Sequence, residues 1–126
     1  MNSSIQTDIA IIGAGPCGLF TVFEAGLVKL KCHLIDALPN VGGQLSEIYP
    51  KKPIYDIPGY PEVLAGDLVA NLMKQIEPFK PGFTLGERAE TLEKTEDGRF
   101  RITTNRNTVI EAPVVCIAGG LGCFEP

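Results

Sequence analysis

Hydrophobic and polar positions follow two spacings along the chain, and these predict its elements. A short apolar run at residues 8–12 ends in glycine and predicts a buried strand. Residues 19–30 are compatible with a helix, and residues 32–35 predict a second strand. Apolar residues then recur at helical spacing from Leu68 to Phe79. We place the N-terminal cap of this second helix at its preceding residues, Gly66 and Asp67, and its end at the prolines 78 and 81.

The rest of the chain predicts a loop and several strands. Residues 37–61 are rich in glycine and proline but also hold all three tyrosines, which is typical of a functional loop rather than a disordered linker. A small antiparallel meander is expected after the second helix, followed by a buried strand and a second glycine turn; the segments are 83–94, 99–104, 108–111, 113–118 and 119–122. The order predicts an α/β fold, with a parallel sheet, crossover helices and a ligand at the carboxyl ends of the strands.

The first glycine turn, GAGPCG at residues 13–18, is the candidate binding motif. Gly13 permits a tight turn, Gly15 lets the backbone approach phosphate oxygens, and Gly18 lets the helix pack closely on the sheet. Asp36 ends the next strand, where an acid can hydrogen-bond ribose hydroxyls. Together they favour a dinucleotide with its pyrophosphate at the helix N-terminus. The alternative is a structural βαβ unit whose glycines only form a turn.

Composition narrows the class of protein. The length of 126 residues suits one domain, and the net charge of −4 argues against a nucleic-acid binder without arguing against phosphate. The polar N-terminus lacks a secretory pattern, and the apolar run after it is too short for a membrane span, so we predict a soluble, cytoplasmic protein. No metal site is expected, because the cysteines at 17, 32, 116 and 123 have no zinc spacing. We interpret them as buried structural thiols and expect His33 to be packed or partly exposed.

Three motifs resemble one family. GAGPCG, then GGQLSEIYPKKPIYDIPGYP, then VVCIAGGLGCFEP resemble the landmarks of thioredoxin-reductase-like (type 2) ferredoxin–NADP reductases, in order and spacing. The resemblance covers residues 8–126 and implies a Rossmann-like FAD-binding domain. It also implies a set of FAD-binding residues, namely Gly13, Gly15, Pro16, Cys17, Asp36, Gly43, Gln44, Tyr49, Ala89, Gly120 and Phe124.

The resemblance gives these residues separate roles. The first turn would hold the pyrophosphate, Asp36 the adenosine ribose, and Ala89 the adenine through its backbone. Gly43, Gln44 and Phe124 would lie near the flavin, and Tyr49 would stack on the isoalloxazine. Simpler interpretations stay open: Gln44 as a polar loop residue, Tyr49 as an anchor of the loop, and Asp36 as a solvated acid.

In the resembled family, NADPH reduces FAD, which passes electrons to ferredoxin or flavodoxin, and the proteins are commonly homodimers. We therefore expect residues 1–126 to be the N-terminal part of an FAD-binding domain, without the nicotinamide-binding domain and the C-terminal flavin segment. We expect weak FAD binding, no reductase activity and no catalytic side chain in this chain alone. Two alternatives are a thioredoxin reductase or other two-domain flavoprotein, such as a flavin monooxygenase, and a non-enzymatic dinucleotide-binding module.

Overall fold

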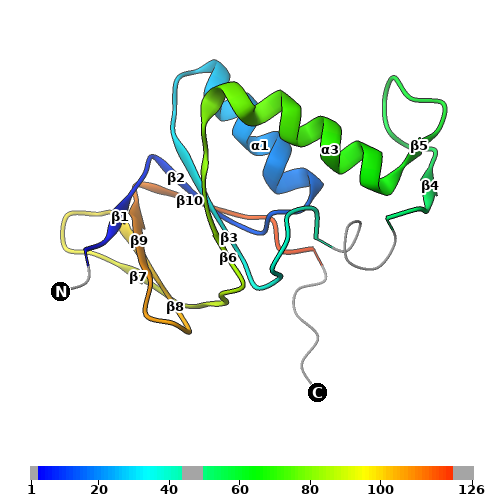
Figure 1. Cartoon of the computed structure of the whole chain (residues 1–126). Helices are drawn as coiled ribbons and strands as arrows, with labels where there is room; N and C mark the ends of the chain where they lie inside the picture. Colours follow the sequence, from blue (N-terminus) through cyan, green and yellow to red (C-terminus); the bar gives the residue numbers. More distant parts are fainter. Residues whose placement is uncertain (1–2, 44–49, 121–126) are drawn as a thin grey trace.

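The computed structural model describes residues 3–43 and 50–120, and the structural statements below refer to these two stretches. Two helices, a parallel sheet and a second, largely antiparallel sheet form three layers (Figure 1). The parallel sheet has the strand order β10 (Val114–Ile117), β2 (Ile9–Ile12), β3 (Cys32–Asp36) and β6 (Gly82–Leu85). The second sheet has the order β1 (Ile5–Gln6), β9 (Val109–Ala112), β8 (Phe100–Thr104) and β7 (Ala89–Lys94). The predicted α/β class, with a parallel sheet and a meander, is confirmed.

The connections explain why helices and meander lie on opposite faces. Helix α1 (Pro16–Leu27) joins β2 to β3, and helix α3 (Ala65–Ile76) lies between β3 and β6 in the chain. Both crossovers step in the same direction across the sheet, so right-handed connections bring both helices to one face. The chain then returns from β6 past β3 and β2 to β10, and its meander covers the other face.

Helix α1 begins earlier than the apolar pattern predicted. Its N-cap is Gly15, and Pro16 occupies the first turn, where a missing N–H costs no helical hydrogen bond. The helix ends at Leu27, and Lys29 follows with a left-handed φ of 65°. The predicted range of 19–30 is therefore displaced toward the C-terminus, because it was set by apolar residues rather than by the glycine and proline.

The predicted cap of the second helix is wrong. Helix α3 already includes Gly66, and no side chain caps it; Asp67 lies in its first turn. The amide of Ala65 donates to the carbonyl of Lys52 at 2.9 Å, and that of Gly66 donates to the carbonyl of Pro50 at 2.8 Å. Backbone carbonyls of the preceding loop therefore do what a capping side chain was expected to do. A short 3-10 helix, Glu77–Phe79, follows α3 where the predicted prolines begin.

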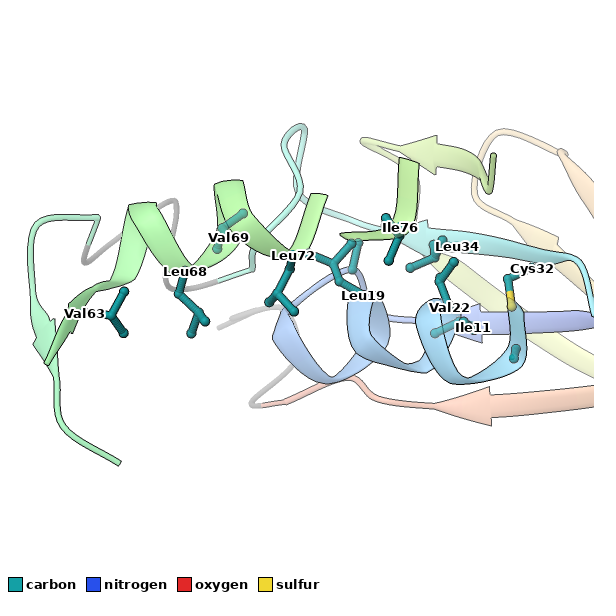
Figure 2. Packing of buried hydrophobic residues seen from close by; sticks show 12 residues of the cluster. Ile11, Leu19, Val22, Cys32, Leu34, Val63, Leu68, Val69, Leu72 and Ile76 are labelled. Atoms are coloured by element: carbon teal, nitrogen blue, oxygen red, sulfur yellow. The ribbon is translucent and has the colours of Figure 1, made fainter. Parts of the chain in front are cut away.

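Two hydrophobic clusters hold the layers together. Between the helices and the parallel sheet, Leu72 of α3 and Leu19 of α1 lie with Leu34 of β3 in one cluster (Figure 2). On the other face, Ala10 and Ile35 of the parallel sheet meet three residues of the meander, Ile102, Ile110 and Ala112. Burial of these side chains from water is the main force that fixes the three layers.

Four strands differ from the sequence prediction. Residues 83–85 were assigned to the meander, but β6 pairs in parallel with β3, with His33 opposite Gly82. Strand β1 was not predicted, and it pairs in parallel with β9. Within the long loop, β4 (Pro53–Ile54) and β5 (Val63–Leu64) form a two-stranded antiparallel ribbon.

The prediction that residues 113–118 form a buried strand is wrong in its burial. Within the described part of the chain, β10 pairs only with β2 and so lies at the edge of the sheet. Val114 is 50% exposed and Ile117 is 72% exposed. No helix in the described residues has both the length and the apolar character needed to span a membrane.

His33 is buried, which is one of the two environments predicted for it. Its Nε2 lies 2.7 Å from Oγ1 of Thr84, a hydrogen bond that joins β3 to β6. Burial lowers the pKa of the imidazole from its ordinary value, because the charged form loses its hydration. His33 is therefore a structural link between two strands.

Candidate functional site

A cleft of about 660 Å³ lies at the carboxyl ends of the parallel strands. In an open α/β sheet this edge, where the strand order reverses, is the usual place for a ligand. The strands on either side of that reversal, β2 and β10, both contribute, as do β3 and the connection after β6. All eight predicted site residues that the structure describes line this one cleft: Gly13, Gly15, Pro16, Cys17, Asp36, Gly43, Ala89 and Gly120.

The three glycines of the first turn have different surroundings. Gly13 has a φ of +113°, and a Cβ there would lie 2.1 Å from the carbonyl oxygen of Ala118. A Cβ at Gly18 would lie 2.1 Å from the carbonyl oxygen of Gly13. A Cβ at Gly15 would meet nothing within 4 Å, although Gly15 lines the cleft. Packing within the described chain thus explains Gly13 and Gly18 but not Gly15.

The start of α1 presents a positive end to the cleft. No side chain caps it, and its first turn holds no acidic residue. Pro16 has no N–H, and the next amides at the helix start have no acceptor within the helix. These donors and the helix dipole together favour an anion.

Asp36 fastens the end of β3 to the glycine turn. Its Oδ2 accepts a hydrogen bond from the amide of Ala14 at 2.7 Å, and its Oδ1 accepts one from the amide of Leu38 at 2.9 Å. The carboxylate therefore orders the cleft before any ligand arrives. Each carboxylate oxygen still has a further lone pair with which to accept a hydroxyl proton.

Two further glycines bring backbone close to the first turn. The amide of Gly42 donates to the carbonyl of Ala14 at 2.7 Å. Gly43 has a left-handed φ of +59°, and a Cβ there would lie 3.4 Å from the Cα of Gly15. Gly120, with a φ of +58°, lines the cleft from the end of β10. The floor of the cleft is thus largely bare backbone.

Arg88 and Ala89 form the wall beyond Asp36. Ala89 begins β7 and pairs with Thr104 of β8. The Arg88 guanidinium lies 2.8 Å from a carboxylate oxygen of Glu90 in a half-exposed ion pair. The cleft therefore follows the order of the strands, from Gly120 past the start of α1 and Asp36 to this wall.

Part of the predicted site cannot be compared with the structure. Gln44, Tyr49 and Phe124 lie outside the described residues. Other lining residues were not among the predicted site residues, namely Ile12, Ile35, Ala37, Leu38, Gly42, Arg88, Ala118 and Gly119. Most of them adjoin a predicted residue in the chain, and that adjacency is the sequence signal that could have identified them.

The cysteines differ from the predicted set of buried thiols. Cys17 is exposed and lines the cleft, so its predicted burial is wrong. Cys32 is buried, as predicted, and burial, together with Asp8 and Cys116, raises the pKa of its thiol to about 11. Cys116 is half-buried, and Cys123 lies outside the described residues. Within the described residues, no group of histidine, cysteine and acidic side chains could hold a metal ion.

Solved structures with the same fold include a thioredoxin reductase and a monooxygenase. The chain superposes on thioredoxin reductase from Streptococcus pyogenes with a TM-score of 0.77 and 23% identity, covering 91% of this chain and 35% of that one. A closed cyclohexanone monooxygenase gives a TM-score of 0.75 at 19% identity, covering 98% and 28% of the two chains. At these identities the likeness establishes the fold. None of the known protein-family models matches the chain.

Curated relatives share much more of the sequence. The chain is 79% identical over 122 residues to ferredoxin–NADP reductase 2 of Christiangramia forsetii, covering 97% of this chain and 34% of that protein. It is 75% identical over 122 residues to a ferredoxin–NADP reductase of Flavobacterium johnsoniae, covering 97% and 35%. The chain thus spans about a third of the length of these relatives. The predicted resemblance is confirmed: over nearly its whole length, this chain is similar to one third of a ferredoxin–NADP reductase.

Proposed function

We propose that this chain binds the ADP half of FAD and is the corresponding part of a ferredoxin–NADP reductase. The single observation that carries the proposal is Gly15. Nothing in the described chain occupies the space that its Cβ would fill, yet it stands at the start of α1 and lines the cleft. A glycine in that position is explained by a ligand that approaches the backbone closely.

The residues present fit an adenine dinucleotide. Its diphosphate would lie at the start of α1, where unpaired amides and the helix dipole meet an anion. The adenosine ribose would lie at Asp36, and the adenine would lie against the backbone of Arg88 and Ala89. No basic side chain is required at the diphosphate, which agrees with the acidic net charge of −4.

The flavin end of the proposal depends on the opposite side of the cleft. Gly43 would approach the flavin side with its backbone, and Gln44, Tyr49 and Phe124 are predicted to complete that side. Gly120 would close the second turn near the phosphates. The flavin supplies hydride acceptance and electron transfer when bound, and the protein binds and orients it. We therefore assign no acid or base to a side chain of this chain.

The activity of the whole protein is proposed from the curated relatives. Their names support a reductase that uses NADP and ferredoxin, and identity of 79% favours it over the thioredoxin reductase alternative at 23%. Flavodoxin as a second acceptor, a homodimeric assembly and a cytoplasmic location are part of the same proposal. The chain alone is expected not to turn over NADPH with ferricyanide.

Calorimetric titration of the 126-residue chain with ADP, FAD, NAD⁺ and riboflavin tests the binding proposal. ADP and FAD are expected to compete for one site, and riboflavin, which lacks the ADP half, is expected not to bind. Alkylation of Cys17, followed by mass spectrometry, gives a second measurement: ADP should slow it because this thiol lines the cleft. Cys32 is the internal control, since its burial and raised pKa keep it unreactive with or without ligand.

Absence of binding by both ADP and FAD would contradict the proposal. Binding of NAD⁺ as tight as that of FAD would favour a general dinucleotide module instead. Turnover of NADPH with ferricyanide by this chain would overturn the expectation that the activity needs the rest of the reductase.

A further inference from the structure

The connection between β6 and β7, residues 86–88, is fixed to the end of β3. The amide of Gly86 donates to the carbonyl of Leu38 at 3.0 Å, and the amide of Glu87 donates to the carbonyl of Asp36 at 3.2 Å. The wall of the cleft at Arg88 and Ala89 is therefore attached to the same segment that carries the proposed ribose-binding acid.

The same connection is fixed to the meander on its other side. The amide of Arg88 donates to the side-chain oxygen of Asn105 at 2.9 Å, and the amide of Asn105 donates to the carbonyl of Arg88 at 2.9 Å. Ala89 pairs with Thr104, and the ladder becomes irregular directly after it. The position of this wall thus depends on the turn between β8 and β9.

Glu87 holds that turn through one oxygen atom. Its Oε1 accepts hydrogen bonds from the hydroxyl of Thr104 at 2.7 Å and from that of Thr108 at 2.6 Å. Oγ1 of Thr104 in turn accepts from the amides of Arg106 at 3.2 Å and Thr108 at 3.1 Å. Thr104 is only 2% exposed, so its hydroxyl needs these partners. The bonds from Thr104 and Thr108 lower the pKa of the Glu87 carboxyl, because they stabilise the carboxylate form that accepts them.

We propose that Glu87 is a positioning residue for the adenine end of the cleft. It does not line the cleft, whereas Arg88 and Ala89, its chain neighbours, do. By fastening residues 104–108 it fixes the backbone that faces the nucleobase, and it leaves the diphosphate site at the start of α1 unaffected. This inference rests on the proposed binding of an adenine dinucleotide.

Two substitutions distinguish the role of Glu87 as a hydrogen-bond acceptor from a role of its charge. Glu87→Ala removes the accepting oxygen, and Glu87→Gln retains an Oε1 that can accept both hydroxyl protons. Glu87→Ala is expected to weaken ADP binding about tenfold, the size of one lost hydrogen bond to a charged group. Glu87→Gln should remain within about twofold of the unaltered chain, because hydrogen-bond geometry is retained. Inorganic pyrophosphate should bind all three chains equally.

Calorimetry with ADP and with pyrophosphate measures these effects, with circular dichroism as a check of folding. Glu93→Ala, which removes an exposed glutamate from β7, the strand that follows Glu87, is the control and should change neither affinity. Adding Thr108→Val to Glu87→Ala should cause little further loss, because both remove one interaction. If Glu87→Ala does not fold, Thr108→Val alone tests the same prediction, with a smaller loss confined to ADP.

Unchanged ADP affinity in Glu87→Ala would overturn the positioning role and leave the proposed function intact. Equal loss of ADP and pyrophosphate binding would overturn it too, as would a loss in Glu87→Gln as large as that in Glu87→Ala. Failure of the unaltered chain to bind ADP would overturn the proposed function and this inference together.

Discussion

The two α-helices in the described part of the chain begin in opposite ways. Each has 12 residues and packs on the same face of the parallel sheet (Figure 1). At the start of α3, loop carbonyls of Lys52 and Pro50 accept the first amides, and Asp67 supplies a negative charge in the first turn. At the start of α1 there is no capping side chain and no acid, and a cleft lies beside it.

The difference shows which hydrogen bonds a helix lacks when its start faces a cleft. A helix start has several amides without intrahelical acceptors, and the chain usually satisfies them itself. Helix α3 does so, and its N-terminus is a structural feature. At the start of α1 no side chain does so, which leaves these amides available for the proposed anion, and α1 is held by packing of Leu19 and Val22 in the core.

The largest effect is expected from alanine at Gly15, the N-cap of α1, which lines the cleft. Gly15→Ala introduces a Cβ that fits the apo chain, since Gly15 has a φ of −80° and open space. It should lower ADP affinity about 30-fold, because overpacking of the approach to the diphosphate costs about 2 kcal/mol. Calorimetry measures the affinity, and urea unfolding should show stability unchanged or raised by up to about 1 kcal/mol.

The matched control is Gly66→Ala at the start of α3. Its Cβ would lie 3.0 Å from the carbonyl oxygen of Pro50, so it acts on packing alone. Unfolding free energy should change by no more than about 1 kcal/mol, and ADP affinity should not change. Equal ADP affinity in Gly15→Ala and Gly66→Ala would remove the functional contrast between the two helices.

A second substitution makes the start of α1 resemble the start of α3. Cys17→Asp places a carboxylate in the first turn of α1, as Asp67 does in α3. We expect stability to rise by about 0.5 kcal/mol through the helix dipole, and ADP affinity to fall about tenfold through repulsion. Cys17→Asn is the neutral control. Undiminished ADP binding in Cys17→Asp would argue against an anion at this helix start.

Removal of the charge at the start of α3 should change only the stability of the chain. Asp67→Asn removes the favourable charge from α3 and should lower the unfolding free energy by about 0.5 kcal/mol. Titration with ADP should give the affinity of the unaltered chain. A loss of ADP binding here would mean that α3 takes part in the site.

The smallest expected effect is a decrease in stability at lower pH. It should be the same whichever helix start is altered. His33 is the only histidine, and burial lowers its pKa in the folded state below the ordinary value. The unfolded chain therefore binds more protons than the folded chain. The contribution of His33 to stability is complete above the unfolded pKa and decreases as pH falls through that pKa. Lowering the pH from 8 to 6.5 should cost at most about 0.4 kcal/mol.

Urea unfolding at the two pH values measures this change. The decrease should be the same in Gly15→Ala and Asp67→Asn, since the hydrogen bond of His33 is to Thr84 and involves neither residue. His33→Gln should abolish it. A decrease that persists in His33→Gln would assign the pH dependence to another group.

Local signals made the first βαβ unit predictable. The apolar run of β2, the glycines of the turn and Asp36 lie close together in the chain, and each has one dominant structural meaning. The partner of β6 could not be predicted in the same way, because His33 and Gly82 are distant in sequence. The cap of α3 was missed for a related reason: its acceptors are loop carbonyls, which no residue type announces.

The candidate site divides similarly. Gly13, Gly15 and Asp36 followed from their spacing, whereas Ala89 came from family resemblance alone, and all four line one cleft. Arg88 and the supporting Glu87 carry no motif, because their role depends on contacts with β8 and β9. The predicted binding roles of all these residues stay predictions until a ligand is measured.

The hydrogen bond from the amide of Ala118 to the carbonyl of Ile12 has a consequence for biosynthesis. It joins Ile12, which directly precedes Gly13, to Ala118, which directly follows β10 and is synthesised more than a hundred residues later. The ribosome must therefore have synthesised residues up to Ala118 before this side of the cleft can form. We expect a chain shortened before β10 to be unable to retain the proposed nucleotide.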